Sequence, residues 1–329
     1  MKTVLVIGLG SMGCRRLRLL KKLRPDLQLC GVDMNDERRK KAEETFSIST
    51  YPCIDSAIET EHPEAAVIST APLTHAAIIR QCLENGLHVF TEINLVPDAY
   101  KENMALAEEK KLVLFLSSTF LYREENRYII ERAKTSAERL NWRYHVGQYL
   151  PDWHPWESFR DYFIGHKRTN GCRELFAIEL PWLQAAFGPI KKVQVIRQKS
   201  TALEIDYDDS YMLLVEHESG HQGCMSVDVV SRKAVRRFEM YGEHLYLTWE
   251  GQPHTLQEYN FEKKVDQTVS LYHEVEQQDG YAAFIVENAY TNELVAFLAQ
   301  VEEGKQPDYG FREDLETLCW IDVIEEQKE

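Results

Sequence analysis

The first 119 residues alternate short apolar runs with amphipathic stretches. A strand buried on both faces gives a continuous apolar run, whereas a helix that covers a sheet gives apolar residues every three or four positions. The runs predict buried strands at residues 4–7, 27–32, 65–69, 88–91 and 112–116. The stretches between them predict helices at residues 14–23, 36–46, 74–85 and 99–110. Strands that alternate with helices are typical of an α/β domain built on a parallel sheet.

The hydrophobic pattern changes after Phe120. Between residues 191 and 249, runs such as 192–196 and 210–215 alternate apolar with polar residues, which predicts an antiparallel sheet. Helix-like segments flank this region at residues 123–133, 173–187, 281–303 and 312–326. We therefore predict two domains, 1–120 and 121–329, the second being an α+β domain with a largely antiparallel open sheet.

Composition and charge limit the classes of partner that we expect for this chain. The 329 residues carry a formal net charge of −15 and no Lys/Arg-rich cluster, which disfavours binding to a phosphate backbone. Every apolar run is shorter than the ~20 residues that cross a bilayer, and the chain begins with a strand rather than a signal segment. We expect no nucleic acid partner, no membrane contact and a cytoplasmic location.

The cysteines and histidines indicate neither a disulfide framework nor a metal site. The chain has 7 cysteines, an odd number, and none has Cys-x-x-Cys spacing. Metal-ligand spacing is also missing among four histidines of the second domain, His217, His221, His244 and His254. We expect reduced thiols and no metal.

A glycine motif follows the first predicted strand and opens the first predicted helix. It comprises Gly8, Gly10 and Gly13 in the order Gly-x-Gly-x-x-Gly, and Asp33 closes the second strand twenty residues later. Gly8 permits a tight turn, Gly10 lets a pyrophosphate approach the backbone, and Gly13 allows close packing of helix on strand. The helix N-terminus adds free N–H groups and partial positive charge. The sequence therefore predicts a doubly wound Rossmann domain that binds a dinucleotide.

Asp33 decides which dinucleotide we expect. A carboxylate at this position accepts hydrogen bonds from the adenosine ribose hydroxyls and repels a 2′-phosphate, which favours NAD over NADP. Arg38 and Arg39 follow a helical turn later and could soften this preference.

Two further segments carry a family resemblance. The sequence from Ala71 to His75, and that from Gly86 to Leu95, resemble the glucose–fructose oxidoreductase / inositol dehydrogenase family, called Gfo/Idh/MocA. The resemblance extends over the whole chain, in detail in the first domain and more loosely in the second. It implies that the strand ending near Pro72 and His75 borders the nicotinamide, with His75 mainly structural. It also implies a homodimer or homotetramer formed through the open face of the second domain's sheet. Motif and resemblance together place the cofactor against Gly8, Gly10, Ser11, Met12, Gly13, Asp33, Thr70, Pro72, His75 and Glu92.

The sequence departs from the family where its chemistry is expected. The family's Glu-Lys-Pro motif reads Glu92-Ile93-Asn94, so isoleucine replaces the lysine that positions substrate and shifts protons. In the second motif, Ile178 and Pro181 replace the family's histidine and aspartate, while Glu174 keeps an acid. The usual acid/base pair is therefore missing.

Replacement acid/base groups must come from other segments. His154 lies in an aromatic stretch whose rings could stack on a sugar, and histidine titrates near neutral pH. Lys167 precedes the second motif and could replace the missing lysine. The alternatives are an aromatic surface loop for His154 and a charged surface turn for Lys167. Substrate contacts are expected from Asn94, Arg123, Trp153, Arg173 and Glu174.

Three functions are compatible with these residues. The first is an NAD(H)-dependent oxidoreductase acting on a hydroxyl or keto group of a sugar, cyclitol or sugar nucleotide, with relocated acid/base residues. The second is a cofactor-binding sensor or partner protein without hydride transfer. The third is an eliminase or hydrolase that retains NAD. We favour the first, because a complete cofactor motif accompanies a full-length second domain.

Overall fold

The computed structural model describes residues 1–153, 158–277 and 285–327. The chain divides into two compact units, one of Met1–Ser118 with Tyr290–Leu315 and one of Thr119–Ala289 with Glu316–Glu329. The domain boundary predicted at residue 120 lies close to Thr119, where the chain first passes into the second unit. Residues 290–315 then return to the first unit. The structure thus shares the last part of the chain between both units.

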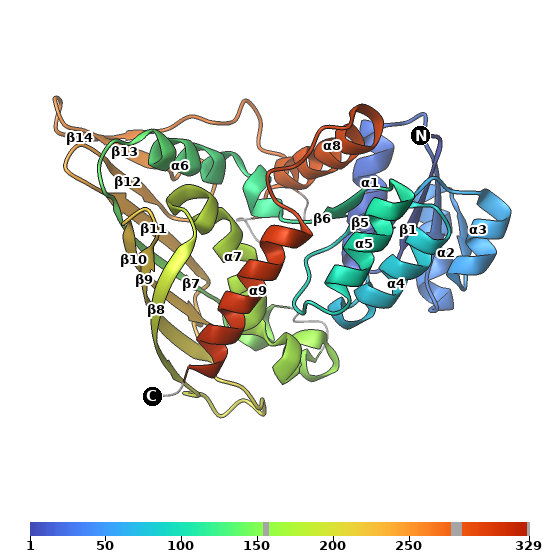
Figure 1. Cartoon of the computed structure of the whole chain (residues 1–329), viewed down its shortest axis with the longest axis horizontal. Helices are drawn as coiled ribbons and strands as arrows, with labels where there is room; N and C mark the ends of the chain where they lie inside the picture. Colours follow the sequence, from blue (N-terminus) through green and yellow to red (C-terminus); the bar gives the residue numbers. More distant parts are fainter. Residues whose placement is uncertain (154–157, 278–284, 328–329) are drawn as a thin grey trace. The chain divides into compact units, whose positions relative to one another are not determined.

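The first unit is built on a parallel sheet (Figure 1). Its strands in the described residues are β1 (Thr3–Ile7), β2 (Gln28–Val32), β3 (Ser49–Tyr51), β4 (Ala65–Ile68), β5 (His88–Thr91) and β6 (Leu114–Leu116). They lie in the order β3-β2-β1-β4-β5-β6, and every pairing is parallel. The order reverses between β1 and β4, which is the doubly wound arrangement. The predicted Rossmann-type fold is confirmed, with β3 as a short edge strand that the apolar pattern missed.

Helices surround this sheet. They are α1 (Ser11–Leu23), α2 (Asp36–Phe46), α3 (Ile54–Glu61), α4 (Pro72–Glu84), α5 (Tyr100–Lys110) and α8 (Glu287–Glu303). Asn35 caps α2 by accepting a hydrogen bond from the Arg38 N–H at 3.1 Å. Phe297 of α8 packs edge-on against Phe90 and Phe115, which are stacked on each other. This apolar contact explains why a late segment of the chain completes the first core.

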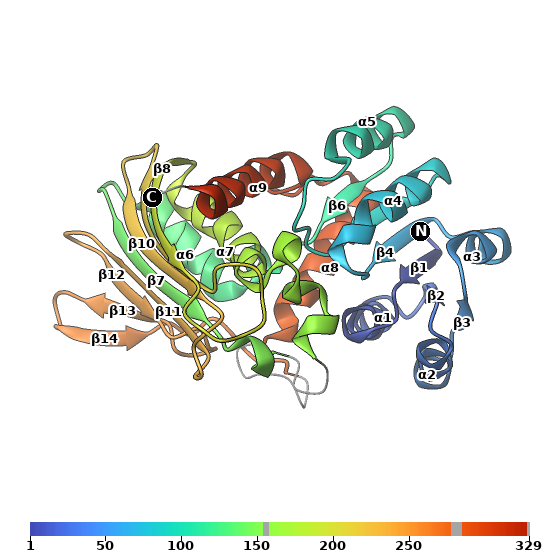
Figure 2. The ribbon, with the colours of Figure 1, turned by 90° about the horizontal axis from the view of Figure 1, so that it is seen from below.

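The second unit is an open sheet with helices on one face (Figure 2). Its described strands are β7 (Asn141–Gly147), β8 (Ile190–Gln198), β9 (Ser210–His217), β10 (Gln222–Asp228), β11 (Val235–Tyr241), β12 (Tyr246–Trp249), β13 (Gln257–Asn260) and β14 (Val265–Thr268). They lie in the order β14-β13-β12-β11-β7-β10-β9-β8, antiparallel except for the β7–β10 pair. The predicted antiparallel sheet is confirmed.

Helices α6 (Glu124–Thr135) and α7 (Gly171–Phe187) cover the inner face of this sheet, together with the later part of α9 (Phe311–Glu326). The inner core is aromatic: Trp142 stacks on Phe187, and Trp182 meets Tyr144 and Phe238 edge-on. Short 3₁₀ helices, among them η2 (Leu150–Asp152) and η5 (Lys167–Thr169), lead into α7. Lys167 lies in η5, and Trp153 directly follows η2.

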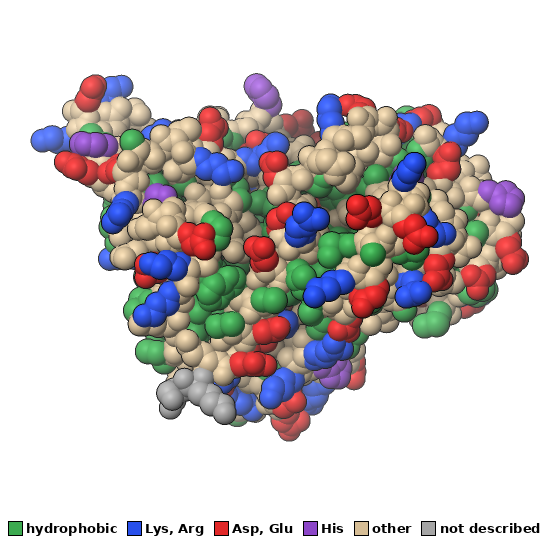
Figure 3. Space-filling model, in the orientation of Figure 1, with side chains coloured by type: hydrophobic (Ala, Val, Ile, Leu, Met, Phe, Trp, Pro, Cys, Tyr) green, Lys and Arg blue, Asp and Glu red, His purple; other side chains and the backbone are tan. Residues whose placement is uncertain are grey.

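Acidic and basic side chains are interspersed on the face shown in Figure 3, so the excess of acid is not gathered into one patch there. Within the described ranges, none of the helices has both the length and the apolar character needed to cross a membrane.

Candidate cofactor and substrate sites

Gly8 and Gly13 are required by the backbone of the β1–α1 turn itself. Gly8 has a φ of +89°, and a Cβ there would lie 2.6 Å from the Ser69 carbonyl oxygen. A Cβ on Gly13 would lie 1.8 Å from the Gly8 carbonyl oxygen. A side chain at Gly13 would push α1 away from β1, whereas one at Gly8 would collide with the backbone that follows β4.

Gly10 has a different reason to be glycine. The atom nearest to a Cβ at Gly10 is Nη1 of Arg38, 3.9 Å away, so no protein atom occupies the space beside it. Gly10 is also the N-cap of α1 and has no side chain to accept from the first N–H groups of the helix. An open backbone surface at a helix N-terminus is the arrangement that binds a pyrophosphate. The residues present therefore fit the expected dinucleotide.

Asp33 lies at the carboxyl end of β2, beside this turn. Its Oδ2 accepts a hydrogen bond from the Leu9 N–H at 2.8 Å, and its Oδ1 accepts one from the Asn35 N–H at 2.8 Å. A carboxylate has about four acceptor positions, so Asp33 can still accept from two ribose hydroxyls. Nη1 of Arg38 lies 3.8 Å from Oδ2 of Asp33. Arg39 forms an ion pair with Asp36 and donates a hydrogen bond to the Asp33 carbonyl oxygen.

His75 connects two segments at the carboxyl edge of the sheet. Its Nε2 lies 2.9 Å from the carbonyl oxygen of Thr70, which follows β4, and its Nδ1 lies 2.6 Å from the side-chain amide of Asn94, which follows β5. Burial lowers the pKa of His75, which keeps the imidazole neutral. Both His75 and Asn94 are fully enclosed. Asn94, expected to contact substrate, therefore holds His75, and this pair positions the Thr70 backbone.

Glu92, at the end of β5, belongs to a buried ionic cluster that the sequence did not reveal. Arg16 of α1 donates to both Glu92 carboxylate oxygens, at 2.6 and 2.8 Å, and to Glu293 of α8 at 2.8 Å. The sequence does contain a signal for the burial of Arg16, because Arg16 shares the apolar face of α1 with Leu17 and Leu20. The partner Glu293 lies far along the chain and gave no such signal.

In the second unit, two predicted substrate residues are engaged internally. Arg123 donates to Glu125 at 2.9 Å and to the Gly251 carbonyl at 3.1 Å. Arg173 donates to Asp322 at 2.7 Å and also pairs with Glu325, both on α9. These contacts fix neighbouring segments of the unit, and the expected substrate contacts of both guanidinium groups stay a prediction.

Glu174, on the first turn of α7, has different surroundings. Its Oε2 is buried and has no hydrogen-bond partner among the described residues. Burial raises the pKa of this carboxyl to about 7. Glu179, five residues later on the same helix, is instead paired with Arg236 at 2.7 Å and accepts from Tyr144 at 2.7 Å. The two carboxylates have separate roles, as their helical spacing predicts.

Two of the remaining candidates, Lys167 and Trp153, lie near the start of α7. Lys167 of η5 is exposed. Trp153 is half-buried, donates to the Gln148 carbonyl at 2.9 Å, and lies 3.6 Å from the position of a Cβ on Gly171, the first residue of α7. His154 lies outside the described residues. Trp153 is thus confined to the neighbourhood in which Glu174 is found.

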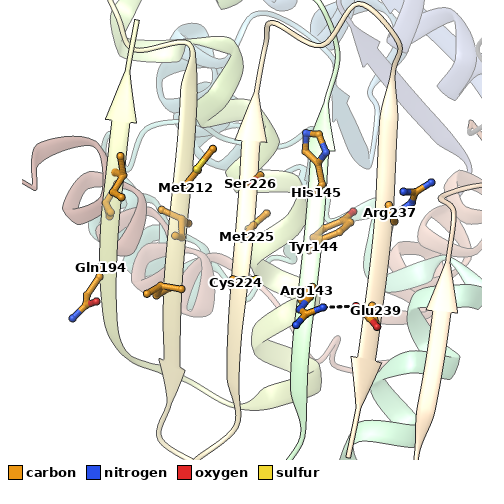
Figure 4. Close-up of a pocket in the computed structure, with 14 residues that line it drawn as sticks. Arg143, Tyr144, His145, Gln194, Met212, Cys224, Met225, Ser226, Arg237 and Glu239 are labelled. Carbon is orange, nitrogen blue, oxygen red and sulfur yellow. Dashed lines mark hydrogen bonds and ion pairs between the residues drawn. The ribbon is translucent and has the colours of Figure 1, made fainter. Parts of the chain in front are cut away.

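A pocket of about 590 Å³ lies on the opposite, open face of the second sheet (Figure 4). Residues of β7, β8, β9, β10 and β11 form it, including Ile196, Met212 and Leu214, which are 73%, 57% and 59% exposed. Arg143 and Glu239, 3.5 Å apart, form an ion pair beside these apolar side chains. Of the predicted catalytic residues, Lys167 is described and does not line this pocket. Over the described residues, no group of three or more His, Cys, Asp or Glu side chains could hold a metal ion.

Comparison with known proteins places the first unit in a family. Residues 2–118 match the model of the Gfo/Idh/MocA family, described as an oxidoreductase family with an NAD-binding Rossmann fold. The match covers 117 of the 329 residues, so the likeness to the Gfo/Idh/MocA oxidoreductases is shown for the first part of the chain. The resemblance drawn from the motifs is confirmed over these residues, and the match supports the assignment as a nicotinamide-dependent oxidoreductase. A search of curated proteins gave no match.

Solved structures extend the likeness over both units. An oxidoreductase from Agrobacterium radiobacter, in complex with NAD+, L-tartaric acid and magnesium, is 12% identical, with a TM-score of 0.82 over 98% of this chain and 94% of that one. Levoglucosan dehydrogenase in complex with NADH is 16% identical, with a TM-score of 0.80 over 98% and 95%. UDP-N-acetylglucosamine 3-dehydrogenase from Acidithiobacillus ferrooxidans is 18% identical, with a TM-score of 0.75 over 98% and 96%. At these identities the likeness establishes the fold.

Proposed function

We propose that this protein uses NAD(H) to interconvert a hydroxyl and a keto group on a sugar, cyclitol or sugar nucleotide. The observation that carries the choice of NAD is the Asp33 carboxylate, which is held beside the glycine turn by two backbone N–H groups. The two dehydrogenases named above, whose names specify sugar substrates, support the substrate class. The family model supports the reaction class.

Glu174 is the group we assign to proton transfer. The bound nicotinamide supplies hydride transfer, and the chain must supply a base that takes the hydroxyl proton as the hydride leaves. A base for this step needs a pKa near the working pH and an oxygen that no other donor occupies. Glu174 meets both conditions, since its pKa is about 7 and its Oε2 is unpartnered among the described residues. Lys167 and His154 stay as the alternative carriers of this role.

Cofactor titration is the first test. We expect calorimetry to show tighter binding of NADH than of NADPH, and Asp33→Ala to reduce that difference because the repulsion of the 2′-phosphate is lost. Equal affinities in the wild-type protein would contradict the assignment to NAD. Binding of neither cofactor would contradict the function as a whole.

Turnover of sugars, followed by the absorbance of the reduced nicotinamide, tests the proton carrier. Glu174→Gln should lower kcat by about 10²- to 10⁴-fold with little change in NADH affinity. In the direction of alcohol oxidation, kcat/KM should rise with pH through about 7, because the carboxylate is the active form. Glu218→Gln, an exposed site in the same unit, is the matched control. If Lys167→Ala abolishes turnover and Glu174→Gln does not, the role belongs to Lys167.

A cofactor-binding protein without hydride transfer is the second candidate. Ile93, Ile178 and Pro181 stand where the family resemblance implies acid/base groups, and none of the three can exchange a proton. This candidate predicts tight NADH binding with no change in nicotinamide absorbance for any sugar. Product formation without net reduction of NAD would instead indicate an eliminase or hydrolase that retains the cofactor.

We further propose that a second copy of the chain covers the open face of the second sheet. Ile196, Met212 and Leu214 form an exposed apolar surface there, and burial of such a surface favours association. Light scattering at micromolar concentration should give a dimer or a tetramer, and Leu214→Asp should shift it toward the monomer. A wild-type monomer would contradict this assembly.

A further inference from the structure

The buried ionic cluster around Arg16, which we call the Arg16 cluster, contains side chains that follow three neighbouring strands of the first sheet. Ser69, Glu92 and Ser117 directly follow β4, β5 and β6, and all three make hydrogen bonds within the cluster. Glu293 completes it by accepting from Arg16 at 2.8 Å, from Ser117 Oγ at 2.9 Å and from the Ser118 N–H at 2.7 Å. The cluster therefore lies at the carboxyl edge of the sheet, on the β4–β6 side of the point where the strand order reverses.

Ser69 connects this cluster to the cofactor turn. Its carbonyl oxygen is the atom that a Cβ on Gly8 would meet at 2.6 Å, and its hydroxyl donates to Glu92 Oε1 at 3.2 Å. In a doubly wound sheet the dinucleotide lies across the reversal point, with its pyrophosphate at the first glycine turn. The nicotinamide half is then placed over β4 and β5. The Glu92 side chain is 11% exposed, whereas those of Arg16 and Glu293 are fully buried, so Glu92 is the member that faces outward.

The cluster contains two carboxylates, those of Glu92 and Glu293, and one guanidinium, that of Arg16. Burial raises the pKa of Glu293, and the Arg16 guanidinium opposes that rise. Arg15 lies against the Tyr290 ring at 4.4 Å, and Arg16 lies 5.4 Å from the same ring. Removing one carboxylate from this enclosed group changes its charge by one unit, whatever Arg15 contributes.

We propose that the two carboxylates on Arg16 favour the oxidised cofactor, NAD+, over NADH. The nicotinamide ring carries a positive charge in NAD+ and none in NADH, so a nearby carboxylate stabilises only the oxidised ring. A charge enclosed by protein acts at a lower effective dielectric constant than one in water, and its influence extends farther. Glu92 and Glu293 thereby set the redox balance of the bound cofactor without contacting the substrate. This inference rests on the proposed binding of a nicotinamide cofactor.

The test compares the dissociation constants of NAD+ and NADH by calorimetry. In Glu293→Gln we expect NAD+ to lose affinity relative to NADH by roughly 3- to 10-fold, the size of a unit charge acting across a partly screened distance. Glu92→Gln removes a unit of negative charge from the other end of the cluster. It replaces Glu293→Gln in the test if the melting temperature of Glu293→Gln is too low for calorimetry. Glu302→Gln is the matched control, because Glu302 lies on the same helix but pairs with Arg24 at the surface.

The outcomes separate this inference from the function it rests on. A changed NAD+/NADH affinity ratio in a folded Glu293 or Glu92 variant, with no change in Glu302→Gln, supports it. Equal weakening of both cofactors would overturn it and leave the cluster a purely structural one. If the wild-type protein binds neither cofactor, the proposed function itself fails.

Discussion

The two units differ in how their functional residues are arranged along the sequence. In the first unit the glycines of the cofactor turn span six consecutive positions, and Asp33 follows on the next strand. In the second unit the candidates are spread over separate segments, and the structure engages Arg123 and Arg173 in internal pairs, whereas one Glu174 oxygen has no partner among the described residues. A site formed by backbone geometry can be inferred from local sequence. A site formed by isolated side chains depends on what each side chain meets after folding.

The largest expected effect concerns the two kinds of glycine in the first unit. Gly13→Ala should destabilise the unit by about 3 kcal/mol or more, because its Cβ overlaps the Gly8 carbonyl and the helix must move. Gly10→Ala should leave the melting temperature nearly unchanged but weaken NADH binding by at least about 10-fold, because the methyl group occupies the pyrophosphate space. Melting and calorimetry on both variants check this. A Gly10→Ala variant with wild-type affinity would mean that the cofactor lies elsewhere.

A slightly smaller effect is expected from the buried pair of the second unit. Arg236→Met leaves the Glu179 carboxylate enclosed without its cation, which should cost about 3–5 kcal/mol in urea unfolding. Arg237→Met, the next residue on β11, removes only a surface pair with Glu250 and should cost less than about 1 kcal/mol. Equal costs for the two variants would show that the Arg236–Glu179 pair is not protected from solvent.

The ion pair between Arg173 and Glu325 of α9 should be measurable as a coupling energy between the two side chains. In a double-mutant cycle, Arg173→Met and Glu325→Gln should couple by about 1–3 kcal/mol of unfolding free energy. KM for the substrate should not change in the folded variants, because the guanidinium is committed to α9. A raised KM without loss of stability would instead return Arg173 to the substrate site.

Glu174 should give an effect of similar size and of opposite sign. Its folded pKa is about 7 against an ordinary value of 4.5, so folding favours the protonated form. That contribution to stability is fully present below 4.5 and is lost as the pH rises through about 7. At pH ~8, Glu174→Gln should therefore be more stable than the wild type by on the order of 1–3 kcal/mol, and at pH ~4 the two should be alike. No gain at high pH would show that the carboxylate has a partner when ionised.

Several expectations about the site were changed by contacts distant in sequence. Asn94 is next to the expected cofactor motif, and the structure adds a contact between its side-chain oxygen and His75. Glu92 was expected to meet the cofactor, and the structure adds Arg16 and Glu293 as its partners. Helix propensity and charge pattern do not report such pairs, because the partners are separated by long stretches of chain.

The sequence alone predicted the parallel and antiparallel sheets, the glycine turn and the family resemblance, and it assigned Asp33 an expected role. Each of these depends on residues close together along the chain: apolar periodicity, a strand followed by a helix, or a turn that only glycine can form. The tertiary structure decided that residues 290–315 join the first unit, that Arg16 holds two carboxylates, and which acidic residue of α7 has an unpartnered oxygen. These outcomes depend on burial and on contacts between distant segments, which exist only once the cores have packed.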